Sequence, residues 1–387
     1  MIESGDAISQ GGPAGVAHDR VEWVNYFTGR RVKALPKSRV YDDQKHPQPT
    51  LITDAVRVLE SNGCFLNQQA VEHHVARVRD ARDQAIKEYK PEDKGYKRAV
   101  GRYINDHFCF RAVNQRRPVP TNAPGVYKFT PAYSVVKTGR LKQPWGGLQS
   151  CSRPMKHAAY SGIPGLRNYD LKGSQLAVVA KELRDANFNP EWLVAYLNTS
   201  EGKRVYAKLA GMDVECWKRC LLALVMGAPL PSTPSPFIAE RSAILEQILE
   251  RAESDLERAE TMREGFAQAV APLVQELNRW HRYLIREYIE KNQRRSRKGA
   301  YVENRAGMRL YLDELNFKGN GRSAKTHLAA FLLQGQEAAF IHALTVLGPE
   351  YSFKPISNEH DGLVVIGEIP ESAVKKAASR SASRTRS

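Results

Sequence analysis

The stretch from residue 238 to residue 293 constrains the fold more than any other part of the sequence. It is long and rich in Glu, Arg, Ala and Leu, and its apolar residues recur in a heptad-like pattern. This spacing places apolar side chains along one face of an α-helix. The pattern predicts two or three long helices in an antiparallel arrangement, with an oligomerising coiled coil as the alternative.

The charge balance indicates what kind of partner the chain binds. Its 387 residues allow two or three domains, or one large unit with subdomains. The 58 Lys and Arg against 42 Asp and Glu give a net charge of +16, which suits a polyanion such as nucleic acid or an anionic membrane. No charge-free apolar run approaches the length of a membrane span and the first residues lack the features of a signal peptide, so we expect nucleic acid and no membrane.

The cysteines indicate a reducing compartment. Their number, five, is odd and their spacing forms no framework, which favours a cytoplasmic location. The close pair Cys216 and Cys220 suits one face of a helix, but no further metal ligands follow. We therefore interpret the pair as small buried residues and not as a zinc site.

Turn and periodicity signals divide the rest of the chain. Residues 51–90 predict two helices separated by Asn62-Gly63, and residues 213–227 predict a capped helix with an acidic start and a terminal glycine. Residues 299–312 resemble a hairpin, and a strong helix follows over 326–348. We expect both chain ends, including the basic and Ser-rich residues 374–387, to lie outside the core.

Two aspartates each lie at the junction of a predicted strand and a turn. Asp170 ends a short segment before a helical stretch, and Asp361 precedes the apolar run Leu363-Val364-Val365-Ile366. Either could be an ordinary turn residue. Two carboxylates at strand ends are also what a two-metal phosphoryl-transfer site requires, because they hold two Mg²⁺ ions on the reacting oxygens.

A cation lies among apolar residues on the predicted helix 213–227. Val214, Lys218, Leu222 and Met226 follow at intervals of four and form a stripe along the helix. A lysine covering apolar surface is one interpretation. The other is a cation for a nucleoside triphosphate, with the apolar neighbours supporting a flat base.

Short segments from about residue 51 onward then match one family in collinear order. "TGRL" (138–141) is similar to a TGRLSS segment, and "YDLKGSQLAVVA" (169–180) aligns without gaps on DYSQIELRVLA. "KRCLLALVMG" (218–227) matches the end of a fingers helix, "LLQGQEAAFIHAL" (332–344) resembles PIQGTAADIIKRAM, and "EHDGLVV" (359–365) falls where VHDEIVV belongs. The chain therefore resembles the family A DNA polymerases, the group of the bacterial repair polymerase and several phage replicases.

The resemblance implies roles for individual residues. Asp170 and Asp361 would bind the two metal ions, Mg²⁺ with Mn²⁺ as a substitute, and Lys218 would neutralise the triphosphate. Gln175 falls at the position that screens the sugar. Further nucleotide contacts are expected from Arg219, Leu222, Met226 and Gly227. Contacts to DNA are expected from Arg140, Gln149, Gln334, His360, Arg294, Arg295, Arg297 and Lys298.

Three positions depart from the family pattern. Gly362 replaces the acid after the final aspartate, Val214 replaces an arginine, and Met226 replaces an aromatic residue. Phage-type RNA polymerases also lack the final acid, so ribonucleotide use or primer synthesis is an alternative, although Gln175 is bulkier than their small sugar-screening residue. A non-catalytic nucleic-acid-binding protein with a degenerate palm is a further alternative. No segment before residue 51 resembles an exonuclease, so proofreading is not expected.

The expected fold is α+β, a right-hand polymerase with an antiparallel-sheet palm, helical fingers and a reduced thumb. Primer-template DNA and dNTPs are the expected partners of a phage- or plasmid-type enzyme, with a replicative helicase or primase as a possible accessory protein. The expected regions are an N-terminal extension (1–50), the thumb (51–135), the first part of the palm (136–183), the fingers (184–320), the second part of the palm (321–373) and a basic tail (374–387).

Overall fold

The computed structural model describes residues 23–24, 31–32, 49–144, 147–231, 242–291, 293–315 and 324–383. The chain divides into two compact units, each assembled from segments that are far apart in the sequence. The first unit holds the described residues up to Val136, together with Leu141–Tyr169 and Ile341–Ala377. The second holds Lys137–Arg140, Asp170–Phe340 and the residues from Ala378 onward.

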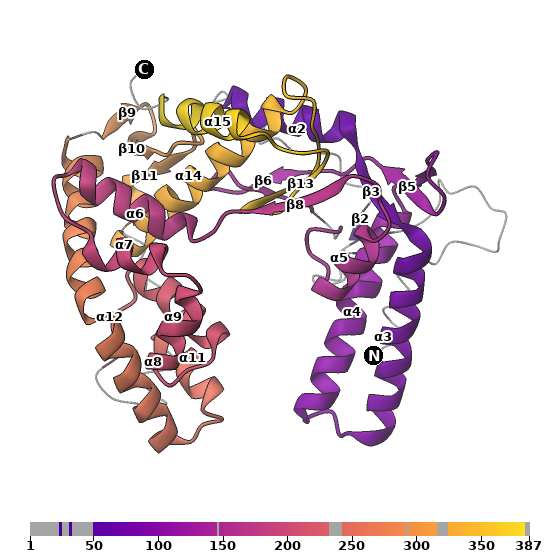
Figure 1. Cartoon of the computed structure of the whole chain (residues 1–387), viewed down its shortest axis with the longest axis horizontal. Helices are drawn as coiled ribbons and strands as arrows, with labels where there is room; N and C mark the ends of the chain where they lie inside the picture. Colours follow the sequence, from indigo (N-terminus) through magenta and orange to yellow (C-terminus); the bar gives the residue numbers. More distant parts are fainter. Residues whose placement is uncertain are drawn as a thin grey trace. The chain divides into compact units, whose positions relative to one another are not determined.

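Two capping residues separate the first two described helices of the first unit. Asn67 accepts a hydrogen bond from the Ala70 amide at 3.0 Å and begins a long helix, while Gly63, at φ +69°, ends the helix before it. Two of the helices, α3 and α4, run side by side as a long pair (Figure 1). The helices are α2 (Thr50–Asn62), α3 (Gln68–Glu88), α4 (Lys94–Asn114), α5 (Arg153–Tyr160) and most of α15 (Glu371–Ser383).

Short strands complete this unit. One sheet has the order β12-β13-β8, another has the order β3-β5-β4, and the two remaining pairs are β6-β7 and β1-β2. The strands are β1 (Trp23–Val24), β2 (Arg31–Val32), β3 (Cys64–Asn67), β4 (Val119–Pro120), β5 (Val126–Phe129), β6 (Ser134–Val135), β7 (Leu141–Lys142), β8 (Leu166–Asp170), β12 (Lys354–Asn358) and β13 (Gly362–Ile366).

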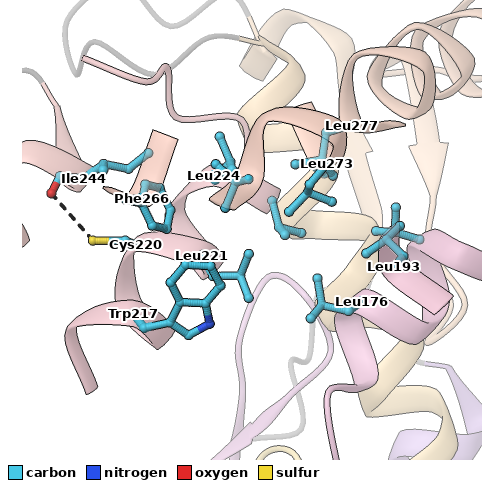
Figure 2. Close-up of a cluster of buried hydrophobic side chains, with 14 of the residues drawn as sticks. Leu176, Leu193, Trp217, Cys220, Leu221, Leu224, Ile244, Phe266, Leu273 and Leu277 are labelled. Atoms are coloured by element: carbon cyan, nitrogen blue, oxygen red, sulfur yellow. Dashed lines mark hydrogen bonds between the residues drawn. The ribbon is translucent and has the colours of Figure 1, made fainter. Parts of the chain in front are cut away.

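Helices dominate the second unit, around one large apolar core. Trp217 and Phe266 meet edge to face in this core, with ring centroids 5.3 Å apart, beside Leu224, Leu273 and Leu277 (Figure 2). The elements are α6 (Ser174–Asp185), α7 (Glu191–Asn198), α8 (Gly202–Leu209), α9 (Val214–Val225), α11 (Ala243–Arg251), α12 (Leu256–Leu284) with a π-helical continuation (Ile285–Lys291), β9 (Arg294–Ser296), β10 (Gly299–Glu303), β11 (Arg309–Tyr311), α13 (Leu312–Leu315) and α14 (Ala324–Leu347).

Helix α14 lies in the protein interior. By length and composition it passes as a membrane span, but 72% of its most apolar stretch is buried inside the protein. Its N-terminal part belongs to the second unit and its last turns, from Ile341, to the first. Burial in the interior explains the apolar sequence of this helix.

The structure confirms most of the expected elements and corrects others. The helix predicted over residues 213–227 and the hairpin predicted over 299–312 are present. The heptad-like stretch forms α11 and α12, whose apolar residues are buried in the core of their own unit. The break after Asn62 holds a strand that was not predicted, and the expectation that the tail lies outside the core is wrong for Ala377, which is fully buried in α15. The predicted N-terminal extension lies almost entirely outside the described residues.

Candidate functional site

The turn between β12 and β13 presents Asp361 to solvent. Both strands are largely buried, and the turn is closed by a hydrogen bond from the Glu359 amide to the Gly362 carbonyl at 3.0 Å. His360 adopts a left-handed backbone, at φ 71°, and its amide donates to the Asn358 side chain at 3.1 Å. Asp361 is exposed, and within the described residues its carboxylate has no hydrogen-bond partner. An anchored turn thus carries an available carboxylate.

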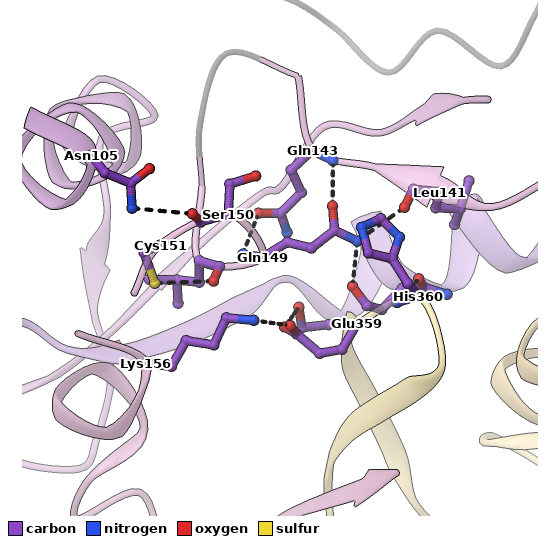
Figure 3. A network of polar contacts seen from close by, with 12 residues as sticks. Asn105, Leu141, Gln143, Gln149, Ser150, Cys151, Lys156, Glu359 and His360 are labelled. Carbon is purple, nitrogen blue, oxygen red and sulfur yellow. Dashed lines mark hydrogen bonds and ion pairs between the residues drawn. The ribbon is translucent and has the colours of Figure 1, made fainter. Parts of the chain in front are cut away.

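The neighbouring carboxylate, Glu359, is already engaged. It forms an ion pair with Lys156 of α5 and accepts a hydrogen bond from the Ser357 hydroxyl at 3.0 Å (Figure 3). Its environment therefore differs from that of Asp361, although the two residues share one turn. A lysine-paired carboxylate is less available to a metal ion than an unpaired one.

Gln149 supports this turn from inside the first unit. Its side chain is buried, and its amide nitrogen donates to the carbonyls of Asn358 at 2.8 Å and Leu141 at 2.9 Å. Its oxygen accepts from the Gln143 amide at 2.8 Å (Figure 3). The sequence suggested contact with DNA, but the structure places this amide in the support of the turn.

Asp170 is the last residue of β8, as the sequence predicts. β8 is the neighbour of β13 in the sheet, and at the far end of these strands the Gly367 amide donates to the Gly165 carbonyl at 2.9 Å. After Asp170 the chain turns through Gly173, at φ +56°, and enters α6 at Ser174. The carboxylate therefore lies at a junction of strand and helix.

Glu337 of α14 forms a polar centre in the second unit that sequence reasoning missed. Its side chain is 3% exposed and accepts hydrogen bonds from the guanidinium of Arg140, the hydroxyl of Ser174 and the amide of Gln175, the last at 3.1 Å. Arg140 and Gln175, both predicted from sequence, are thus brought together by a residue that was not. The available signal was a single acid among small and apolar residues on a predicted helix.

A second buried contact fixes the segment that carries Arg140. The Asn304 amide donates to the Thr138 carbonyl at 3.0 Å and to the Phe331 carbonyl at 3.2 Å. A Cβ atom on Gly335 would lie 2.2 Å from the Asn304 side chain, so only glycine allows this approach. The Gln-Gly pair at 334–335 therefore has a structural reason for its glycine, while Gln334 itself is half-buried on α14.

The predicted stripe on α9 is only partly exposed, because Val214 and Met226 are half-buried and pack against the core of the second unit. Trp217, Cys220 and Leu221 point into the core (Figure 2), whereas Leu222 is 48% exposed. Lys218 Nζ lies 3.9 Å from Glu215 Oε2, a weak surface pair that a phosphate can replace. Arg219 is exposed and contacts Glu215 and Gln247, and Asp213 caps the helix by accepting from the Glu215 and Cys216 amides.

Gly227 follows α9 in a left-handed conformation, at φ +91°, beside a buried histidine. A Cβ atom there would lie 3.5 Å from His281, whose ring nitrogen contacts the Val225 carbonyl at 3.3 Å. Burial lowers the pKa of His281 to about 4, and nearby Lys325 acts in the same direction. The last residue of α9, Val225, therefore contacts a neutral imidazole.

The predicted basic segment is the hairpin of β9 and β10. Arg295, Arg297 and Lys298 are exposed, while Arg294 pairs with Glu303 at 3.2 Å. Exposed cations on a short hairpin suit phosphates in a sequence-independent way.

Candidate metal ligands are few among the described residues. Among the described residues there is no group of three or more His, Cys, Asp or Glu side chains that could hold a metal ion. Cys216 and Cys220 instead contact the carbonyls of Gln247 and Ile244, in agreement with the interpretation as buried small residues. Asp170 and Asp361, the pair predicted from the sequence, have carboxylate oxygens, which are the ligand type that Mg²⁺ prefers.

Comparison with known proteins identifies the fold. The sequence matches no protein-family profile and no curated protein. The structure is similar to the POL domain of Pol1 from M. smegmatis, solved in complex with DNA primer-template and dNTP, with a TM-score of 0.55 and 12% sequence identity. The similarity covers 86% of this chain and 66% of that one. The chain therefore has the mixed helical and antiparallel-sheet fold of a DNA polymerase domain.

Proposed function

We propose that the chain is a template-directed DNA polymerase that extends a primer with dNTPs. The observation that carries this proposal is the placement of two carboxylates in a polymerase fold. Asp170 ends β8 and Asp361 directly precedes β13, and these strands are neighbours in one sheet. The fold match to a polymerase domain adds a second, independent support.

Asp170 and Asp361 are the residues that would hold Mg²⁺. Two Mg²⁺ ions held by these carboxylates would supply the electrostatic stabilisation that an in-line phosphoryl transfer needs. Asp361 suits this role because its carboxylate is exposed and unpaired within the described part of the chain. Gly362 leaves the turn with one acid fewer than the family pattern has, so the proposal relies on these two carboxylates.

Other residues would bind and orient the substrates. Lys218 would neutralise the triphosphate, with the exposed Leu222 one turn further along α9 and the half-buried Met226 directly after the helix. Gln175 would exclude a sugar with a 2′-hydroxyl, while Arg140 and Gln334 would contact the primer-template. His360 would help to place the primer end. The exposed cations of the β9-β10 hairpin would contact template phosphates, which predicts a binding constant that falls with salt.

Primer extension tests the proposal and separates it from its alternatives. A labelled primer annealed to a template is offered dNTPs and then NTPs, with Mg²⁺, and the product lengths are followed. We expect template-directed extension with dNTPs, and loss of extension but not of DNA binding in Asp170→Ala and Asp361→Ala. Preferential extension with NTPs would replace the proposal with an RNA polymerase or primase. Binding without extension would indicate a degenerate palm.

A further inference from the structure

Glu337 brings together residues from three distant segments of the second unit. Arg140 precedes β7, Ser174 and Gln175 begin α6, and Glu337 lies on α14. In the family pattern to which this stretch was compared, the corresponding residue is alanine, so the carboxylate is a feature of this chain. A buried carboxylate needs such partners, because it would otherwise lose its hydration without compensation.

The bonding pattern sets the orientation of the Gln175 side chain. Glu337 Oε2 accepts from Gln175 Nε2 at 3.1 Å and from Arg140 Nη2, and Glu337 Oε1 accepts from the Ser174 hydroxyl. An ionised carboxylate can only accept hydrogen bonds, so the amide nitrogen of Gln175 must face it. The amide oxygen then faces away, and in the described structure it is buried without a partner.

The same contact restricts the motion of Gln175. A glutamine side chain has three rotatable bonds and loses substantial rotamer freedom when it is fixed. Hydrogen bonds to a charged group are the stronger ones, so Glu337 has the means to keep the amide in one place. The N-terminus of α6 carries a partial positive charge, and this charge stabilises the nearby carboxylate of Glu337.

We infer that Glu337 is a positioning residue for sugar selection, which holds the Gln175 amide in the place where it blocks a 2′-hydroxyl. This inference rests on the proposed function, since only a polymerase of this family would place Gln175 beside the sugar of the incoming nucleotide. Glu337 would act through Gln175, because its own side chain is only 3% exposed. A freed Gln175 would swing aside and admit ribonucleotides more readily.

A double-mutant cycle on sugar selectivity tests the inference. The ratio of kcat/KM for a dNTP to that for the matching NTP is measured in the wild type, Gln175→Gly, Glu337→Ala and the double variant. We expect the ratio to fall about tenfold in Glu337→Ala, the effect of one charged hydrogen bond. Because Glu337 acts through Gln175, the double variant should match Gln175→Gly alone. An unchanged ratio in Glu337→Ala, or additive effects of the two substitutions, would overturn the inference.

Two further variants separate positioning from folding. Glu337→Gln keeps the size of the side chain and removes its charge, so it should fold and lower the ratio less than Glu337→Ala. Glu276 is a matched control, a buried glutamate of the same unit that accepts from the Trp192 and Leu193 amides. Glu276→Ala should lower stability and leave the dNTP to NTP ratio unchanged. A ratio that falls equally in Glu276→Ala would show a general loss of structure and overturn the inference.

An activity-independent measurement separates failure of this inference from failure of the proposed function. With ¹⁵N-labelled glutamine, the side-chain amide signals of Gln175 are assigned by their absence in Gln175→Gly. Their hydrogen exchange should be slow in the wild type and faster in Glu337→Ala. Equal exchange in both would refute the positioning contact. Slow exchange in a protein that extends no primer would instead refute the polymerase assignment and the sugar selectivity with it.

Discussion

Two buried carboxylates, one in each unit, have the same kind of partners and different surroundings. In the first unit, Asp106 of α4 is fully buried and accepts hydrogen bonds from His74 of α3 at 2.8 Å and from the Ser152 hydroxyl at 2.6 Å. In the second unit, Glu337 accepts from Arg140, Ser174 and Gln175. Both combine a hydroxyl and a basic side chain around one acid.

The two carboxylates differ in the further roles that we expect of their hydrogen-bond partners. His74 and Ser152 join α3, α4 and the start of α5, and none of the residues expected to contact nucleotides is among them. Arg140 and Gln175 are residues that the sequence assigns to DNA and to the sugar, and each keeps a buried polar atom without a partner in the described structure. Similar chemistry therefore joins helices in one unit and, in the other, holds two residues that we expect to face substrates.

The largest effect is expected when Asp106, the carboxylate that only joins helices, is removed. Asp106→Ala leaves the buried His74 and two donors of the half-buried Ser152 without their acceptor, so the free energy of unfolding should fall by roughly 3–5 kcal/mol. Urea unfolding measures it. The control is Asp54→Ala, which removes an exposed pair with Arg57 and should cost less than about 1 kcal/mol. If both substitutions had the same small effect, the network around Asp106 would not stabilise the helices.

The buried His281 should make the stability of the second unit depend on pH. The pKa of His281 is lowered to about 4, so between pH 6.5 and about 4 the unfolded chain binds a proton that the folded chain does not. The contribution of this group to stability is therefore present above the unfolded pKa and is lost as the pH falls, by roughly 3 kcal/mol. Urea unfolding of the wild type and His281→Gln at about pH 7 and about pH 4 isolates it. A glutamine still donates to the Val225 carbonyl and does not titrate, so an identical pH dependence in both proteins would contradict the assignment.

Sequence reasoning reached the residues that local patterns mark. Asp170 and Asp361 were expected at strand ends, and Lys218 and Leu222 on one stripe of a helix, because strand boundaries and helical spacing depend on nearby residues. The structure places them as expected, at the end of β8, before β13 and on the exposed face of α9. The fold class was also within reach of sequence, and the comparison with a polymerase domain confirms it.

Long-range contacts lay beyond the sequence. Glu337 meets Arg140 across 197 positions, and no local signal identifies that partner. Gln149 illustrates the same limit, since the family resemblance predicts a DNA contact, but no local pattern predicts that its buried amide donates to the Asn358 and Leu141 carbonyls. The tail helix was missed because its Lys and Arg residues mask the small alanines that it buries, Ala373 and Ala377.

The most direct test of the account compares the two acids of one turn. Single-turnover primer extension with dNTPs is measured for Asp361→Ala and Glu359→Ala at the same Mg²⁺ concentration. Asp361, exposed and unpaired in the described structure, should be the metal ligand, so its loss should slow extension by about a thousandfold or more. Glu359 is engaged by Lys156 and Ser357, and its loss should slow extension by no more than about tenfold. Equal effects, or a larger effect in Glu359→Ala, would contradict the assignment of Asp361 to catalysis.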